Sequence, residues 1–209
     1  MSTKNISEIL NKLIVKRSSY AQTESEFAIL ANVIERSNTI PGAFAEIGVL
    51  EGLTSEFIFM FKNKEKKFFL CDTFQGLVDV SEKDISNQNT CLSNGFAKNS
   101  YENFCAVNTF IQFKDVVVVN GYFPGSATPE MDQSKYAFVH LDVDTYSSTL
   151  NSLKYFYDKM HPGGSIVVHD YINNPETLGV RRALDEFMAG KNDEISTNPN
   201  STQAIIIKN

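Results

Sequence analysis

From residue 43 onward, short apolar runs alternate with segments of helical periodicity, and no other feature constrains the fold as strongly. The runs typical of strands are 43–47, 68–71, 116–119, 136–141, 165–168, 194–196 and 204–207. Strands separated by helices predict a mostly parallel sheet with right-handed crossovers and helices on both faces. A polar turn over 198–201 makes the last strand antiparallel to its neighbour. The predicted fold is therefore α/β, with a mostly parallel seven-stranded sheet and an antiparallel C-terminal strand.

Helical spacing of apolar residues marks two segments among the first forty residues and the connections between the strands. We expect helices over 6–14, 27–34, 53–61, 101–110, 147–160 and 180–188. Thr23 or Ser25 is suited to cap the second helix. The H-P-G-G run at 161–164 is expected to stop a helix and to turn into the following strand. Pro41-Gly42 breaks the pattern, so we predict a helical N-terminal extension over 1–40 and one compact domain over 41–209.

Length and charge limit the class of protein. The 209 residues suit one well-buried core. A net charge of −6 argues against nucleic acid or an anionic membrane as the main partner. The sequence has no apolar run long enough to span a bilayer and no signal-peptide pattern. Three widely spaced cysteines, Cys71, Cys91 and Cys105, suggest reduced thiols and a cytoplasmic protein, with Cys71 buried in a strand.

The segment 75–100 is polar and has no clear period. A loop of this length in a compact domain is usually functional or mobile. Two interpretations are equally well supported: a lid over a substrate, or an insertion with irregular helix.

Acidic residues follow two of the predicted strands at the point where each strand ends. Asp142 and Asp144 follow 136–141, and His169 and Asp170 follow 165–168. The carboxyl edge of an open α/β sheet is where such folds bind ligands, so the two ends are placed to hold a divalent cation. Magnesium prefers oxygen ligands, whereas a nitrogen from His169 favours manganese or another transition metal. The alternatives are that Asp170 caps the next element and that His169 is a satisfied core histidine.

A glycine turn follows the first strand. Gly48 and Gly52 let the backbone turn tightly and approach a ligand, and Glu46 precedes them. Thr54 and Ser55 lie near the start of the next helix, whose free N–H groups suit a ligand carboxylate. The spacing differs from the dinucleotide fingerprint, which argues against a nicotinamide dehydrogenase.

Two further groups follow the second and third strands. Asp72, with Thr73 and Phe74 after it, lies about twenty residues beyond the glycine turn, the position of a ribose-binding carboxylate. The alternative is a turn or helix-cap aspartate. Gly121, Tyr122 and Phe123 offer aromatic surface for an adenine, although aromatic residues after a strand more often cap the core.

These residues resemble the macrocin O-methyltransferase (TylF-like) family of class I S-adenosylmethionine-dependent enzymes, whose members methylate sugar hydroxyls on antibiotics and other glycoconjugates. The most specific matches are L-D-V-D-T-Y-S-S-T at 141–149 and R-R-A-L-D-E-F at 181–187. Further matches are the turn at 46–52, C-D-T-F-Q-G-L at 71–77 and N-G-Y-F at 120–123. The resemblance implies a Rossmann-like class I methyltransferase fold, with the methyltransferase domain over 41–209.

The resemblance also implies roles for individual residues. The cofactor methionine would lie near Glu46, Gly48, Thr54 and Ser55, and the ribose on Asp72. A magnesium-type ion would be held by Asp142, Asp170 and the residue at position 169, where the family usually has aspartate and this chain has histidine. Asp142 would act in catalysis through that ion, and Asp144 would be the base.

The expected function is S-adenosylmethionine-dependent, divalent-metal-assisted O-methylation of a sugar hydroxyl, such as that of a deoxyhexose on a glycan or glycosylated natural product. Mg²⁺ is the expected ion, with Mn²⁺ as the alternative. A metal-dependent catechol or phenol O-methyltransferase is a second interpretation, and a non-catalytic nucleotide-binding scaffold a third. Apolar residues of the N-terminal helices either form a homodimer interface or pack on their own core.

Overall fold

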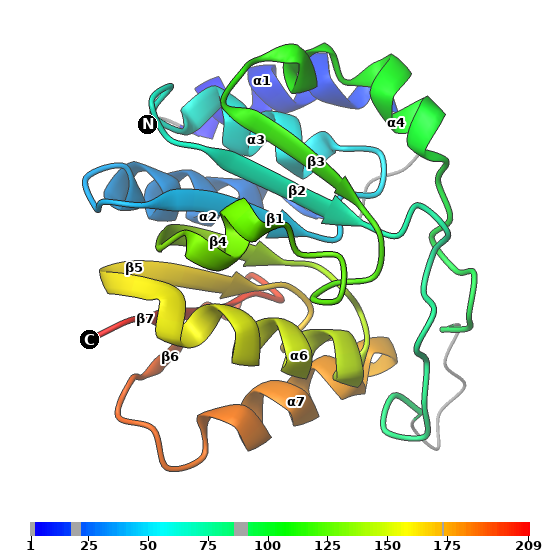
Figure 1. The fold of residues 1–209 in the computed structure, drawn as a ribbon, viewed down its shortest axis with the longest axis vertical. Helices are drawn as coiled ribbons and strands as arrows, with labels where there is room; N and C mark the ends of the chain where they lie inside the picture. Colours follow the sequence, from blue (N-terminus) through cyan, green and yellow to red (C-terminus); the bar gives the residue numbers. More distant parts are fainter. Residues whose placement is uncertain (1–2, 18–21, 86–91, 173) are drawn as a thin grey trace.

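The computed structural model describes residues 3–17, 22–85, 92–172 and 174–209. Within these residues, seven strands form one sheet: β1 (Ala43–Ile47), β2 (Phe68–Asp72), β3 (Val116–Asn120), β4 (Tyr136–Leu141), β5 (Met160–Val168), β6 (Ile195–Thr197) and β7 (Ala204–Ile207). The strand order is β3-β2-β1-β4-β5-β7-β6 (Figure 1). Strands β1 to β5 are parallel, and β7 is antiparallel to both of its neighbours. The mostly parallel sheet with an antiparallel C-terminal strand is therefore confirmed.

Helices cover both faces of this sheet (Figure 1). They are α1 (Thr3–Ile14), α2 (Glu24–Ser37), α3 (Leu53–Phe61), α4 (Tyr101–Val107), α5 (Pro129–Gln133), α6 (Tyr146–Phe156) and α7 (Leu178–Met188). Short 3-10 turns lie at Thr109–Gln112, Tyr157–Lys159 and Pro175–Thr177. Apolar residues of α1, α2, α3 and α4 pack on one face, and those of α6 and α7 pack on the other. None of the helices in the described ranges is long and apolar enough to cross a membrane.

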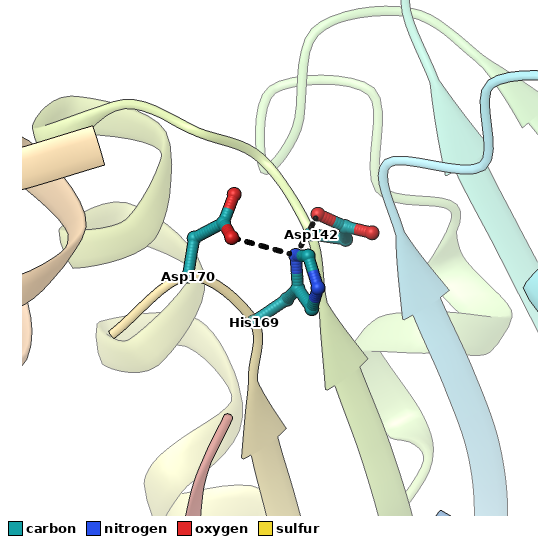
Figure 2. Close-up of side chains that lie close together, drawn as sticks. All are labelled: Asp142, His169 and Asp170. Atoms are coloured by element: carbon teal, nitrogen blue, oxygen red, sulfur yellow. Dashed lines mark ion pairs between the residues drawn. The ribbon is translucent and has the colours of Figure 1, made fainter. Parts of the chain in front are cut away.

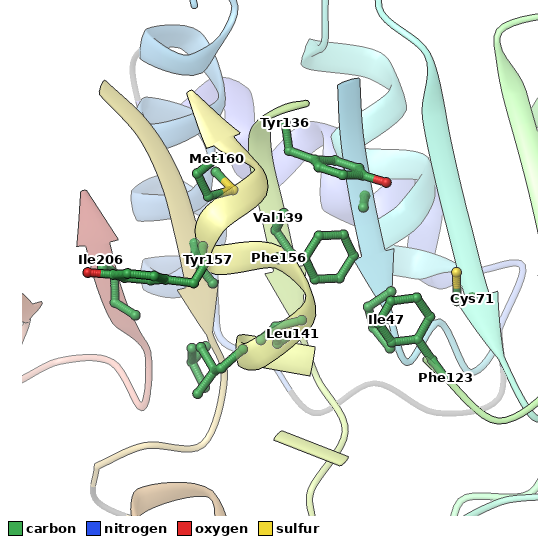
Figure 3. Close-up of a cluster of buried hydrophobic side chains, with 14 of the residues drawn as sticks. Ile47, Cys71, Phe123, Tyr136, Val139, Leu141, Phe156, Tyr157, Met160 and Ile206 are labelled. Carbon is green, nitrogen blue, oxygen red and sulfur yellow. The ribbon is translucent and has the colours of Figure 1, made fainter. Parts of the chain in front are cut away.

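The core between the sheet and α6 is rich in aromatic rings (Figure 3). Phe156 stacks on Phe123 with ring centroids 5.2 Å apart and meets Tyr136 edge to face at 4.8 Å. Cys71 is fully buried in this core, as predicted. Large rings packed from both sides hold β1, β2 and β4 in register, and their carboxyl ends therefore form a fixed platform.

The start of β5 corrects one prediction. The H-P-G-G run at 161–164 lies inside β5, and the preceding helix ends at Phe156. The register with β4 passes from Tyr136 opposite Met160 to Phe138 opposite Ser165, so the run forms a bulge. Gly163, at φ +82°, takes the left-handed conformation that this bulge needs. A bulge also tolerates the missing N–H of proline, which is why a strand can carry this sequence.

The N-terminal helices are part of the packed structure. Thr23 caps α2, as one of the two predicted residues, and forms a reciprocal capping box with Glu26. Phe27 of α2 packs against Phe57 of α3 with ring centroids 4.8 Å apart. Helices α1 and α2 therefore lie on the same face of the sheet as α3. The division of the chain after residue 40 stays a prediction.

The remaining boundaries differ by a few residues from those predicted. The helix expected over 101–110 is split into α4 and a 3-10 turn, and α5 was not predicted. The long polar segment after β2 has turns in its described parts, 75–85 and 92–100, while Cys91 and its neighbours at 86–90 lie outside the described residues. In Figure 1 this segment lies at the end of the sheet toward which the arrows of β2 and β3 point.

Candidate active site at the carboxyl edge of the sheet

A cavity of about 540 Å³ opens at the carboxyl ends of β1, β2, β4 and β5. This volume is within the range of small-molecule sites. Most of the residues selected from the sequence line it: Glu46, Gly48, Thr54, Asp72, Thr73, Gly121, Tyr122, Phe123, Asp142, Asp144, His169 and Asp170. Gly52, Ser55 and Phe74 lie outside the lining, so any part they play is indirect. Gly52 caps α3, Ser55 is buried behind Glu46, and the ring of Phe74 packs on Phe104.

Asp142, His169 and Asp170 meet where β4 and β5 end (Figure 2). Nδ1 of His169 lies 3.1 Å from Oδ1 of Asp142 and 3.2 Å from Oδ1 of Asp170. Neighbouring parallel strands bring their ends together, which confirms the expected juxtaposition of the two acidic clusters. The side chain of His169 is 4% exposed, so the imidazole is held in place between the two carboxylates.

Charge and burial oppose each other in this group. Burial lowers the pKa of His169, but the carboxylates of Asp142 and Asp170 outweigh it and hold the pKa well above its usual 6.5. Burial raises the pKa of Asp142, but the charge of His169 outweighs it and lowers the pKa to about 2. The imidazolium and the two carboxylates therefore stabilise one another when no other cation is bound.

The three side chains have the chemistry of a divalent-cation site. One ligand atom from each lies within 4.8 Å of the other two. Although Nδ1 of His169 is close to both carboxylates, neither ring nitrogen makes a hydrogen bond within the described part of the chain. A buried donor or acceptor without a partner is costly, and a bound cation would satisfy it. The residues present therefore fit a divalent metal.

Two residues of the N-terminal segment reach this group, and sequence reasoning missed both. Nε2 of Gln22 donates to Oδ2 of Asp142 at 3.1 Å. Oε1 of Glu26 lies 3.9 Å from Nε2 of His169, on the side of the ring away from Asp142. The T-x-x-E pattern at 23–26 marks the start of a helix, but it carries no sign that its glutamate faces a histidine 143 positions later.

Asp144 lies in the turn after β4. The strand ends at Leu141, so Asp142 and Asp144 are placed by a turn, and both still line the cavity. Burial, with the nearby charges of Asp142 and Asp170, raises the pKa of Asp144 well above its usual 3.8. A carboxylate with a raised pKa is a stronger base, which suits a proton acceptor.

Several non-glycine residues at the carboxyl edge of the sheet have a strained, left-handed backbone conformation. Leu50, Phe74, Asp144 and Asp170 have φ between 47° and 62°, and each follows the end of β1, β2, β4 or β5 by two or three residues. Such conformations cost free energy and cluster at ligand-binding sites, where the surrounding structure imposes them. The strain therefore marks the carboxyl edge independently of the charges.

The glycine turn is packed against the acidic turn. A Cβ at Gly48 would lie 1.8 Å from the carbonyl oxygen of Asp142, and φ at this residue is +84°. Asp72 holds the turn from the other side. Its Oδ2 accepts hydrogen bonds from the N–H groups of Val49 at 2.8 Å and Leu50 at 3.0 Å, and Oδ1 accepts from Phe74 N at 2.8 Å. Asp72 thus acts as a turn aspartate, and it also lines the cavity.

Glu46 is a buried carboxylate that lines the cavity. Its Oε2 accepts a hydrogen bond from Ser55, and its Oε1 lies 3.1 Å from Nδ1 of His140, the residue beside it on β4. Burial raises the pKa of Glu46, although His140 and Ser55 oppose the shift. His140 was not selected from the sequence, because its pairing with Glu46 depends on the register of β1 and β4.

The polar segment after β2 forms one wall of the cavity. Asp79 anchors it to the start of α6: Oδ1 accepts from Oγ1 of Thr145 at 2.8 Å, and Oδ2 accepts from Oγ of Ser148 at 2.8 Å. Oδ2 also accepts from the hydroxyl of Tyr122 at 2.9 Å. Buried Asp84 accepts from the N–H of Tyr146 at 2.5 Å. Two carboxylates at the N-terminus of a helix give the wall a firm attachment.

Tyr122 and Phe123 have different surroundings. The ring of Phe123 is 4% exposed and packs on Phe156, so it chiefly caps the core. Tyr122 is 38% exposed and faces the cavity beside Asp79. Of the two aromatic residues, Tyr122 has the ring surface available to a ligand.

Comparison with known proteins identifies a family whose sequence pattern this chain matches. The sequence model of the family described as macrocin O-methyltransferase (TylF) matches residues 24–199. Demethyldecarbamoylnovobiocin O-methyltransferase of Streptomyces niveus is 25% identical over 166 residues, which cover 73% of this chain. The match spans 60% of the length of that curated relative.

Solved structures share the fold. The O-methyltransferase NovP has a TM-score of 0.71 at 23% identity, over 90% of this chain and 83% of that chain. A calicheamicin methyltransferase has a TM-score of 0.73 at 18% identity, over 98% of this chain and 90% of that chain. In a second structure, that enzyme is named as a TDP-rhamnose 3′-O-methyltransferase. At these identities the likeness shows the fold, and it confirms the Rossmann-like class I methyltransferase architecture.

Proposed function

Because the chain belongs to the macrocin O-methyltransferase family, we propose that it is an S-adenosylmethionine-dependent O-methyltransferase whose acceptor is a sugar hydroxyl. The observation that carries the proposal is the family match, and a cavity lined by Asp142, Asp144 and Asp170 supports it. The relatives named for demethyldecarbamoylnovobiocin and TDP-rhamnose support an acceptor from natural-product chemistry, such as a deoxyhexose on a glycan or glycosylated compound.

The cofactor side of the cavity is the glycine turn with the end of β2. When bound, S-adenosylmethionine supplies an activated methyl group. Gly48 lets the backbone approach the ligand, and the N-terminus of α3 offers free N–H groups to its carboxylate. Asp72 has a lone pair on Oδ1 for a ribose hydroxyl, and exposed Tyr122 offers a ring for the adenine. These roles are part of the proposal.

The acceptor side is the acidic group. Asp142, His169 and Asp170 would hold a divalent cation, which when bound lowers the pKa of a coordinated hydroxyl and orients it. Asp144 lines the same cavity and accepts the proton of the acceptor hydroxyl. The protein's own contribution is to align the acceptor oxygen behind the methyl group and to take up this proton.

The first test is calorimetric binding of S-adenosylhomocysteine to the full chain, with Mg²⁺, with Mn²⁺ and after chelation. Micromolar affinity is expected, and methyl transfer is then assayed in parallel with glycoside and catechol acceptors. Binding with transfer to the glycosides supports the proposal. Transfer to the catechols alone would mean that the acceptor is a phenol and not a sugar hydroxyl. Absence of binding in all three conditions would overturn the enzyme assignment in favour of a scaffold.

Asp142→Ala separates chemistry from cofactor binding. This substitution removes a carboxylate from the acceptor side and leaves the glycine turn in place, so turnover should be lost while affinity for S-adenosylhomocysteine stays nearly intact. Normal turnover of this variant, with or without a chelator, would contradict the metal-assisted mechanism.

A further inference from the structure

The two nitrogens of His169 face different carboxylates. Nδ1 lies 3.1 Å from Asp142 and 3.2 Å from Asp170, at the point where the three ligand atoms converge. Nε2 points the opposite way and lies 3.9 Å from Oε1 of Glu26. The imidazole is 4% exposed, and within the described ranges neither nitrogen has a hydrogen-bond partner. The ring therefore has one nitrogen for a ligand between the aspartates and another facing a third carboxylate.

Glu26 is fixed in this position by a set of hydrogen bonds. Its Oε1 accepts from the N–H and the hydroxyl of Thr202, each at 2.7 Å, and its Oε2 accepts from Thr23 N at 2.7 Å. The residue is 1% exposed. A carboxylate that is buried and held from both sides cannot turn away from the imidazole, so its negative charge is a permanent feature of the surroundings of Nε2.

That charge selects the form in which the ring can bind a metal. At 3.9 Å the contact with Glu26 is electrostatic. With a cation between Asp142 and Asp170, the one proton of the neutral ring would be on Nε2, where the charge of Glu26 favours it. The lone pair is then on Nδ1, which faces Asp142 and Asp170. A carboxylate that accepts a hydrogen bond from a metal-binding histidine commonly fixes the tautomer and raises the basicity of the ligand nitrogen, and Glu26 is placed to act on Nε2 through its charge.

A ligand set of two carboxylates and one imidazole has a definite preference among divalent ions. Mg²⁺ binds oxygen and holds its water tightly, whereas imidazole suits transition metals such as iron, nickel and zinc. We propose that His169, oriented by Glu26, makes this a site selective for a divalent transition metal, Mn²⁺ included, over magnesium. This inference rests on the proposed function, which requires a divalent ion but does not specify this one.

The experiment measures the metal directly, on the full chain freed of metal by a chelator. Mn²⁺ and Mg²⁺ are titrated separately by calorimetry, and the nitrogen couplings of bound Mn²⁺ are recorded by pulsed electron paramagnetic resonance. We expect Mn²⁺ to bind at least about tenfold more tightly and to show coupling to one directly bound nitrogen. The spectrum of the unmodified protein tests ligation by His169 even where a variant fails to fold.

Two substitutions test the roles of the residues. His169→Asp gives an all-oxygen site, so the nitrogen coupling should vanish. The ratio of the affinities for Mn²⁺ and Mg²⁺ should become smaller than in the unmodified protein. Glu26→Gln keeps the shape and removes the charge behind the ring, and should weaken Mn²⁺ binding by about 10-fold to 100-fold. Glu24→Gln, at an exposed position in the same helical turn, removes an equal charge and should leave the affinity unchanged.

The double variant separates orientation from general structural damage. If Glu26 acts through the imidazole, Glu26→Gln should cause no further loss of metal affinity in the His169→Asp background. An equal loss in both backgrounds would mean that Glu26 only supports the fold, and would overturn its part in the proposal.

Equal affinity for Mg²⁺ and Mn²⁺ in the unmodified protein, or bound Mn²⁺ without nitrogen coupling, would overturn the selectivity. Binding of S-adenosylhomocysteine and methyl transfer are measured on the same preparation. If they are normal while the selectivity is absent, the further inference fails and the proposed function stands; if both are absent, the proposed function itself fails.

Discussion

Nδ1 of His169 lies 3.1 Å from Oδ1 of Asp142, and this pair joins the ends of two neighbouring strands. Oδ2 of the same aspartate accepts a hydrogen bond from Gln22, which precedes α2. Asp142 is thus held by β5 on one side and by the N-terminal segment on the other. The position of Asp142 therefore depends on contacts with two other parts of the chain.

Stability in the presence of a chelator should depend on pH through this pair. The pKa of His169 is raised on folding, so its contribution is fully present below pH 6.5 and is lost as pH rises through the higher folded value. The free energy of unfolding should therefore fall above pH 6.5, with a slope of up to about 1.4 kcal/mol per pH unit for one proton. Urea titrations of the protein and of His169→Asn would show the slope and its flattening; identical slopes would contradict the pairing.

The same pair predicts that the free energy of unfolding also falls at low pH. The pKa of Asp142 is lowered to about 2, so its contribution is present above pH 3.8 and is lost as pH falls from there toward 2. Asp142→Asn should lose less stability over this interval than the unmodified protein does. The comparison needs unfolding midpoints measured at several pH values between 2 and 5, with chelator throughout.

Gly48→Ala should be far more damaging than Gly190→Ala. Both glycines have positive φ, +84° and +79°, so both variants carry the cost of a left-handed alanine, about 1–2 kcal/mol. At Gly190 no described atom lies within 4 Å of the added Cβ, whereas at Gly48 it would lie 1.8 Å from the carbonyl oxygen of Asp142. Denaturation and binding of S-adenosylhomocysteine would measure the difference. Equal losses in the two variants would mean that the turn can move away from Asp142.

Asp144→Asn should reduce turnover by about 10²-fold to 10⁴-fold, the usual contribution of a general base, and should leave cofactor affinity within a factor of two. Since the base acts in its ionised form, protonation of Asp144 at acid pH should lower the rate of the unmodified enzyme. A rate profile without this acid limb, or a variant with near-normal kcat, would remove Asp144 from the role.

Asp79→Ala should loosen the cavity wall. The substitution removes the acceptor of the hydrogen bonds from Tyr122, Thr145 and Ser148, and bonds to a charged group contribute about 1.5–3 kcal/mol each. Hydrogen exchange over 77–85 should become faster, and KM for the acceptor should rise more than affinity for the cofactor falls. Glu82→Ala, at an exposed position of the same segment, is the matched control; an equal effect there would exclude a specific anchor.

The periodicity of the sequence was sufficient to predict the order and type of most strands and helices. Strands β1, β4 and β7 and helix α3 were predicted to the residue, because each is a short apolar run or a helical pattern bounded by turn residues. The H-P-G-G run was misassigned because its glycines and proline signal a turn in isolation. Pairing with both neighbours carries β5 through it, with Gly163 N donating to the carbonyl of Lys208 at 2.7 Å.

The sequence by itself determined which side chains reach the carboxyl edge of the sheet, since strand ends and the residues after them are local features. Only the tertiary structure decided what those side chains meet. Gln22 contacts a residue 120 positions away, and Glu26 is held by Thr202, 176 positions away. Such contacts depend on how α2 packs against the sheet and on the register of its strands. No local pattern records them, because packing, rather than periodicity, sets the distance between residues far apart in the chain.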